Sequence, residues 1–162
     1  MFITNHVLAG AIIGLAAPRR PAKVALVAVG SHFVLDSVPH WGIHDDDATF
    51  RKVAIVDGLV GLATMRAVMG AVPRGTRVAV LAGMLGAAFP DADKPMDMFF
   101  GRSPFPLPVD RFHQRIQRES AHGIRTELRA ALAMVLAVRV LSWLRAVTAD
   151  RLGSISAEIP AR

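Results

Sequence analysis

The chain contains no cysteine, which removes several kinds of chemistry at once. Disulfide bonds, zinc-finger ligand sets and thiol catalysis are excluded, so any metal ion must be bound by histidine, aspartate or glutamate. A basic region before the first apolar segment is also lacking, which argues against a cleaved signal peptide and predicts that this segment is retained. The 162 residues are enough for one domain with its own core.

Apolar residues dominate the composition. They make up 52% of the chain, more than in an ordinary soluble domain, and the mean hydropathy is +0.39. The net charge of +6 suits either nucleic acid or anionic lipid as a partner. Because the arginines are not interleaved with stacking aromatic residues, we expect membrane lipid and no nucleic acid.

Proline and charged clusters divide the chain into apolar segments. Their alanine and leucine content, their lengths and their proline or glycine boundaries favour helix over strand. A polar region at 91–125 separates the last segment from the others; within it we expect a short amphipathic helix over Val109–Glu119 and an extended linker over 103–108. The prediction is an all-α fold, a compact bundle of about five helices. The expected helices cover residues 2–17, 24–38, 53–72, 78–89 and 127–149.

Several features predict that this bundle is embedded in a membrane. Gly10 and Gly14 have the spacing of close helix packing in bilayers, and Trp41 and Trp143 fall near segment ends, where interfacial aromatic residues belong. Against this, the segment at 78–89 is shorter than the roughly 20 residues of a full span. We expect a multi-pass protein of the inner membrane, and a compact soluble bundle is the alternative.

The distribution of basic residues predicts the orientation. Basic side chains crowd the short connections at 18–23 and 73–77, and the positive-inside rule places that end of the bundle in the cytoplasm. The other end then faces the periplasm or the exterior. Basic residues within 91–125 favour the reverse orientation. The expected organisation is one helical domain over 1–150 with a short tail at 151–162.

Metal-type side chains appear where one apolar run ends. His32 and Asp36 are four residues apart, so on a helix they share a face and suit one divalent ion. Pro39 disfavours a helical conformation at the residue before it, so His40 falls just past the helix end and can turn back towards the same ion. A buried core histidine and a polar helix end are the structural alternative.

Antiparallel packing of the five segments brings the other ionisable residues to the same end of the bundle. All six histidines of the chain fall there, which scattered core or surface histidines would have no reason to do. His44 is expected to be solvated in an acidic loop. We therefore predict a metal site at this end. The candidate ligands are His6, His32, Asp36, His40, Asp57, Asp91, Asp93, His113 and His122.

Two parts of this set have specific arguments. Asp57 lies inside an apolar segment, where a carboxylate costs about 3 kcal/mol on insertion scales and is a functional candidate. A salt bridge to a nearby basic side chain is its structural alternative. Asp91 and Asp93 follow Pro90 in a turn and can both point inward as a chelating pair, or form a solvated helix end.

Four features together resemble the small membrane-bound metal-dependent hydrolases of bacteria and archaea. They are Asn5-His6 before a glycine-rich helix, His32-x3-Asp36, Pro90-Asp91-x-Asp93, and a later histidine-bearing segment before a final helix. The resemblance covers about residues 1–125 and implies a short helical bundle in the membrane with His and Asp gathered as metal ligands. The His32-x3-Asp36 helix is also loosely similar to zinc-dependent phospholipase C.

The chain departs from this family at two positions. Lys94 follows Asp93, where the family commonly has histidine. The later histidine pattern of the family is replaced by Phe112-His113-Gln114-Arg115 and a distant His122. Both departures bear on the number of metal ions and on catalysis itself.

The expected function follows from the ligand types. A site of histidine and aspartate suits one or two Zn²⁺ ions best, with Mn²⁺ or Fe²⁺ as alternatives. We expect hydrolysis of a phosphoester, a lipid or a small phosphorylated compound, through a metal-activated water. The alternative is a non-catalytic membrane protein that binds a structural or transported ion. Candidate proton acceptors are Asp57 and Glu119, and candidate contacts to the substrate phosphate are Arg111, Arg115 and Arg118, which otherwise form a solvated helix face.

Overall fold

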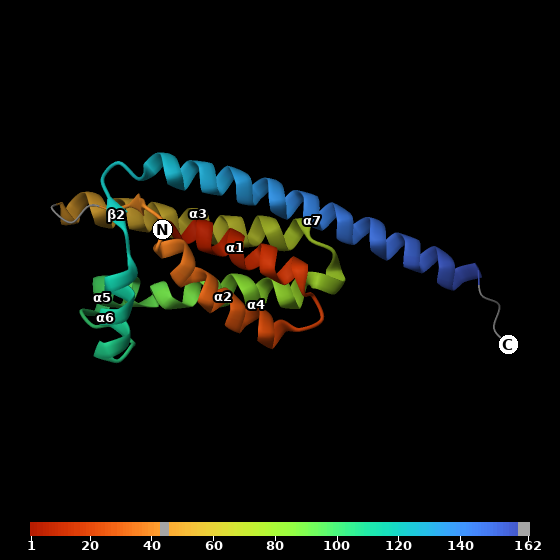
Figure 1. Ribbon diagram of the computed structural model, residues 1–162, viewed down its shortest axis with the longest axis horizontal. Coiled ribbons are helices and arrows are strands. Elements are labelled where there is room, and N and C mark those ends of the chain that lie inside the picture. Colours follow the sequence, from red (N-terminus) through yellow and green to blue (C-terminus); the bar gives the residue numbers. More distant parts are fainter. Residues whose placement is uncertain (43–45, 159–162) are drawn as a thin grey trace.

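The computed structural model describes residues 1–42 and 46–158, and His44 lies outside this part. Within it the fold is all-α, as predicted, with helices packed into a compact bundle (Figure 1). Two short 3₁₀ turns and one pair of two-residue parallel strands complete the fold. The elements are α1 (Ile3–Ala16), α2 (Pro21–Asp36), β1 (His40–Trp41), α3 (Asp47–Ala71), η1 (Arg74–Thr76), α4 (Arg77–Ala88), η2 (Phe89–Ala92), α5 (Asp93–Phe100), α6 (Leu107–Ile116), β2 (Glu119–Ser120) and α7 (Ile124–Glu158).

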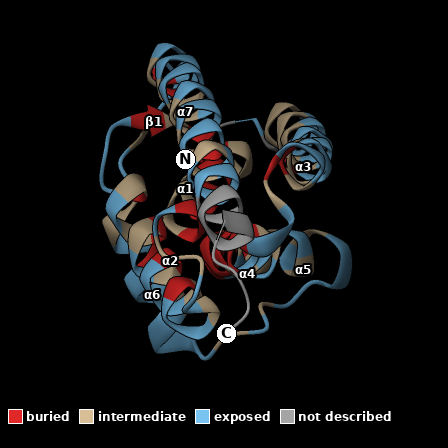
Figure 2. Ribbon diagram, turned by 90° about the vertical axis from the view of Figure 1, so that its right-hand side faces the viewer, coloured by how far each residue is buried: buried red, intermediate tan, exposed pale blue. Residues whose placement is uncertain are grey.

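Helix α1 is the centre of the bundle and packs against α2, α3, α4 and α7. Buried residues concentrate on α1, α2 and α4, whereas α3 and α7 are largely exposed (Figure 2). The core is built from side chains of α1 and α4 such as Leu8, Leu15 and Met84, each 2% exposed or less. These three inner helices therefore form the buried frame of the molecule.

Glycines let the backbones of this frame touch. A Cβ atom on Gly10 of α1 would lie 2.2 Å from the carbonyl oxygen of Gly83 of α4, and one on Gly14 would lie 2.5 Å from Cα of Val80. On the other side of α4, a Cβ atom on Gly86 would lie 2.5 Å from the carbonyl oxygen of Ala25. Any larger residue would push the helices apart, so these glycines set how closely α1, α2 and α4 approach one another.

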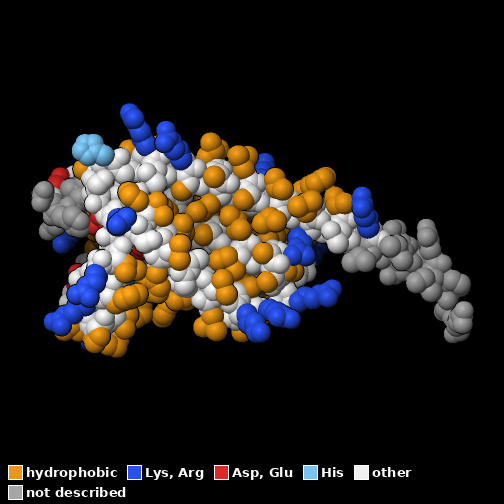
Figure 3. Space-filling view, viewed as in Figure 1, with side chains coloured by type: hydrophobic (Ala, Val, Ile, Leu, Met, Phe, Trp, Pro, Cys, Tyr) orange, Lys and Arg blue, Asp and Glu red, His pale blue; other side chains and the backbone are white. Residues whose placement is uncertain are grey.

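The outer helices carry apolar side chains on their exposed faces. Segments Ala48–Ala71 of α3 and Ile124–Arg151 of α7 are long and apolar enough to cross a membrane by length and composition, and only 11% and 6% of their most apolar windows are buried. Leu59 and Leu132, for example, are each 63% exposed. Hydrophobic side chains cover the middle of the face in Figure 3, with lysine and arginine towards the ends.

A buried carboxylate joins α7 to the inner helices. Glu127 is 1% exposed and accepts hydrogen bonds from the backbone N–H of Phe2 (3.1 Å), from Nδ2 of Asn5 (2.7 Å) and from the backbone N–H of Trp41 (3.3 Å). The start of α7 is thereby held against the start of α1 and against β1. This is the end of the bundle that carries the histidines.

Several boundaries differ from the sequence-based expectations. Helix α3 begins earlier than expected, because the Asp46 side chain caps it by accepting from the N–H groups of residues 48 and 49. The 91–125 region forms both α5 and α6, and Glu119, expected at a helix end, lies in β2 instead. Helix α7 continues past the expected boundary at residue 150 to Glu158.

Candidate metal centre

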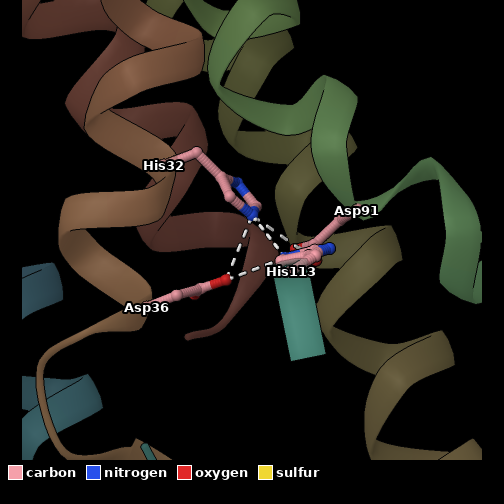
Figure 4. A group of neighbouring side chains, drawn as sticks. All are labelled: His32, Asp36, Asp91 and His113. Carbon is pink, nitrogen blue, oxygen red and sulfur yellow. Dashed lines mark hydrogen bonds and ion pairs between the residues drawn. The ribbon is translucent and has the colours of Figure 1, made fainter. Parts of the chain in front are cut away.

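Four buried side chains converge at the end of the bundle where β2, α5 and α6 lie (Figures 1 and 4). His32 and Asp36 come from the last turns of α2, Asp91 from η2 and His113 from α6. One ligand atom from each lies within 4.8 Å of the others. Residues distant in the sequence, two of them histidines, thus come together at this end of the bundle.

The distances within this group fit a single metal ion. The Nε2 atoms of His32 and His113 are 3.0 Å apart, and they lie 3.1 and 3.0 Å from Oδ2 of Asp36. Both nitrogens are 3.8 Å from Oδ1 of Asp91. A tetrahedral ion with bonds of about 2.0–2.1 Å has ligands separated by roughly 3.3–3.4 Å. The observed separations lie on either side of this value.

The second nitrogen of each ring shows where its proton lies. Nδ1 of His32 is 2.8 Å from the carbonyl oxygen of Ala87, and Nδ1 of His113 is 3.2 Å from Oδ2 of Asp93. Both oxygens can only accept, so both Nδ1 atoms carry hydrogen, and the neutral rings turn their Nε2 lone pairs towards each other. Lone pairs of two nitrogens and a carboxylate then meet at one point, which requires a cation: a proton on one ring or a metal ion. A histidine whose second ring nitrogen donates to a carbonyl or carboxylate is typical of metal ligands.

The electrostatics of the group favour positive charge. Burial alone would lower the pKa of His113, but hydrogen bonds to the Asp36 and Asp93 carboxylates outweigh it and raise the pKa to about 9. Burial alone would raise the pKa of Asp91, but the Lys94 ammonium and neighbouring histidines lower it to about 2. Burial alone would also lower the pKa of Lys94, yet its contact with Asp91 raises it. Without a metal ion, a proton on His113 therefore takes the central position.

His6 of α1 lies against the group from the other side. Its Nε2 is 3.1 Å from Oδ1 of Asp36 and 3.9 Å from Oδ2 of Asp91, the oxygens that face away from His32 and His113. Its ring stacks on His32 with centroids 3.9 Å apart, and its Nδ1 is buried with no hydrogen-bond partner in the described part of the chain. The two carboxylates thus each present one oxygen to the four-residue group and one to His6. The amino group of Met1 also donates to Oδ1 of Asp36 (2.6 Å).

Of the other predicted ligands, Asp93 is a neighbour of the group, and three lie elsewhere. Asp57 accepts hydrogen bonds from the N–H groups of Ile3 and Thr4 and from the Thr4 hydroxyl, so it caps the start of α1 from α3. His40 is buried, with Nδ1 2.8 Å from the carbonyl oxygen of Val38. His122 is exposed in the turn before α7.

The arginines predicted to contact the substrate phosphate are exposed. Arg111 and Arg115 are exposed on α6 and line a shallow hollow with Phe112, outside the four-residue group. Arg118 is exposed as well, and its backbone N–H donates to the carbonyl oxygen of Asp36. Glu119 is half-buried in β2, where its Oε1 lies 3.9 Å from Nε2 of His40.

Two residues at the centre were not assigned a role from the sequence. Lys94 contacts Oδ1 of Asp91, and Gln117, in the amide orientation that satisfies both of its ends, accepts from Nζ of Lys94 (3.1 Å) and donates to Oε1 of Glu119 (3.2 Å). A signal for both exists in the spacing. Lys94 follows Asp91 by three positions, which places neighbours on one face of a helical turn, and Gln117 follows His113 by four.

A cavity of about 450 Å³ adjoins the centre. It lies among the start of α1, β1, α3 and α5, and Asp91 and Lys94 belong to both its wall and the charged cluster. Comparison with protein-family models, with curated proteins and with solved structures found no match for the chain.

Proposed function

We propose that this protein is a membrane-bound, metal-dependent hydrolase that acts on a phosphoester. The observation that carries the proposal is the meeting of two imidazole lone pairs and two carboxylates at one buried point. Both rings are oriented by hydrogen bonds from their Nδ1 atoms. The resemblance to small membrane-bound metal-dependent hydrolases supports the same reading. The large exposed apolar faces of α3 and α7 support membrane insertion. The basic residues of the short connections at 18–23 and 73–77 support a site that faces the periplasm or exterior.

The ligand set favours Zn²⁺, with Mn²⁺ or Fe²⁺ as alternatives. A divalent ion supplies Lewis acidity and lowers the pKa of a bound water to about 7. His32, Asp36, Asp91 and His113 would hold it. A second ion at His6 and the outer oxygens of the two aspartates would have to displace the Met1 amino group from Oδ1 of Asp36.

The remaining polar groups have roles that suit phosphoester hydrolysis. Lys94, which contacts Oδ1 of Asp91, can hold an anionic phosphate, while Arg111, Arg115 and Arg118 are exposed. Glu119 is the preferred proton acceptor because it borders the cavity beside Lys94; Asp57 also borders it but is engaged with α1. The adjoining cavity favours catalysis over a purely structural ion, which needs no space for a substrate.

Metal-dependent activity tests the proposal. Detergent-purified protein should contain about one or two equivalents of metal and hydrolyse bis(4-nitrophenyl) phosphate, with activity lost on chelation and restored by Zn²⁺. His32→Ala and Asp36→Ala should lose both metal and activity while the helical circular dichroism remains. His122→Ala, at an exposed histidine, is the matched control and should retain both. Metal content unchanged in the His32 and Asp36 variants would contradict the proposal.

A further inference from the structure

The cavity beside the metal centre has mostly apolar walls. Its volume of about 450 Å³ lies within the range of small-molecule sites, roughly 300–1,000 Å³. Leu59 and Phe99, two of its lining residues, are 63% and 67% exposed, so the cavity opens on the outer apolar surface of the bundle. The apolar part of the wall includes Trp41, Phe50, Val53, Leu59, Met98 and Phe99.

The polar part of the wall is contiguous and continues into the metal centre. Lys94 contacts Asp91, and Gln117 links Lys94 to Glu119. Asp57 also borders the cavity, but its oxygens accept hydrogen bonds from the N–H groups of Ile3 and Thr4. The cavity therefore joins an apolar space to a cationic group and the candidate metal ligands.

We propose that this cavity binds the hydrocarbon chain of an amphiphilic, lipid-like phosphoester, whose phosphate lies at Lys94 beside the metal centre. This inference rests on the proposed function and selects lipid over small phosphorylated compounds as its substrate. Lys94, whose Nζ contacts Asp91, would pair with the phosphate when the ligand binds, and the apolar walls complement the chain. In the reaction, water adds to phosphorus, the P–O ester bond breaks, and the alcohol leaves with the proton, so no further reactant is needed.

Binding can be measured without turnover. The chain has two tryptophans, and Trp143→Phe leaves Trp41, in the cavity wall, as the only one. The probe is dodecylphosphonate with bromine on its chain, a non-hydrolysable analogue that quenches tryptophan emission on contact. We expect saturable quenching, with affinity rising about fourfold for each methylene between butyl and longer chains until the cavity is filled. Bromododecanol, which lacks the anionic head, should bind at least about tenfold more weakly.

Two glycines of α3 provide a matched pair of variants. Gly58 lines the cavity and Gly70 does not, yet a Cβ atom at either position meets no atom within 4 Å. Both Gly58→Leu and Gly70→Leu should therefore fold. In the Trp143→Phe background, Gly58→Leu should weaken quenching at least about tenfold because its side chain fills part of the cavity. Gly70→Leu should leave the quenching unchanged.

The outcomes separate this inference from the proposed function. Equal quenching in the two leucine variants, or no dependence on chain length, overturns the inference even if bis(4-nitrophenyl) phosphate is hydrolysed. Saturable quenching that Gly58→Leu removes supports the inference even if no hydrolysis is found, a result that would contradict the proposed function alone.

Discussion

At the scale of single residues, protonation of the imidazole rings decides what the cluster binds. His32 and His113 each donate their Nδ1–H to an acceptor, so Nε2 is the atom available for an ion. Oδ2 of Asp36 lies close to both rings, and its Oδ1 lies close to His6. The arrangement makes a proton and a divalent cation competitors for the same position.

This competition predicts how metal affinity depends on pH. In the metal-free protein the pKa of His113 is raised to about 9, so at neutral pH this ring is protonated and metal binding must release the proton. The apparent affinity for Zn²⁺ should rise about tenfold per pH unit between pH 6 and 8 and level off above the pKa. Calorimetry in buffers of different ionisation enthalpy measures the released proton. Affinity independent of pH would show that His113 is not a ligand.

The buried Glu127 carboxylate gives a second prediction at this scale. Glu127→Gln replaces an acceptor oxygen with an NH₂ group facing backbone N–H donors, so it should lower the free energy of unfolding by about 1–3 kcal/mol. Thermal unfolding in detergent measures the loss. Asp150→Asn, at an exposed position of the same helix, is the control and should change stability by less than about 0.5 kcal/mol. Equal stability of the two variants would refute a role for Glu127 in anchoring α7.

At the scale of elements, close packing of α1 and α4 positions the candidate metal ligands. A Cβ atom on Gly83 would lie 2.1 Å from the carbonyl oxygen of Gly10, and α4 also supplies the Ala87 carbonyl that orients His32. Gly83→Ala should therefore destabilise the protein by about 1–3 kcal/mol or more and weaken metal binding. Gly70→Ala, in open space on α3, should be neutral or stabilise it by up to about 1 kcal/mol. Thermal unfolding and metal titration of both variants make the comparison, and equal effects would contradict it.

Much of the fold and part of the site follow from sequence patterns. The four-residue spacing of His32 and Asp36 predicted a shared helix face, and their side chains lie together. The roles of Lys94 and Gln117 were not predicted, because their contact joins α5 to the residue after α6, two parts of the chain that are distant in the sequence. Asp57 was identified as a buried carboxylate in need of partners. Its partners are N–H groups at the start of another helix, which no local pattern reveals.

At the scale of the whole molecule, the short basic connections at 18–23 and 73–77 lie at one end of the bundle and the histidine cluster lies at the other (Figure 1). The absence of cysteine allows single-cysteine labelling to locate them. His122→Cys, exposed in the turn before α7, should react with an impermeant maleimide in spheroplasts, because that end is expected to face outward. Gly75→Cys, in η1 at the other end, should react only after lysis. The reverse pattern would place the site inside the cell, and labelling of both without lysis would contradict membrane insertion.

The central claim is that His32, Asp36, Asp91 and His113 hold one metal ion. Zinc K-edge X-ray absorption of detergent-purified protein tests it most directly, because the spectrum reports the atoms bound to the ion. The account predicts two imidazole nitrogens and carboxylate oxygens at about 2.0–2.1 Å, with the signal of one imidazole lost in His113→Ala and the spectrum of His122→Ala unchanged. A protein without stoichiometric metal, or a spectrum that His32→Ala and His113→Ala both leave unaltered, would contradict the account.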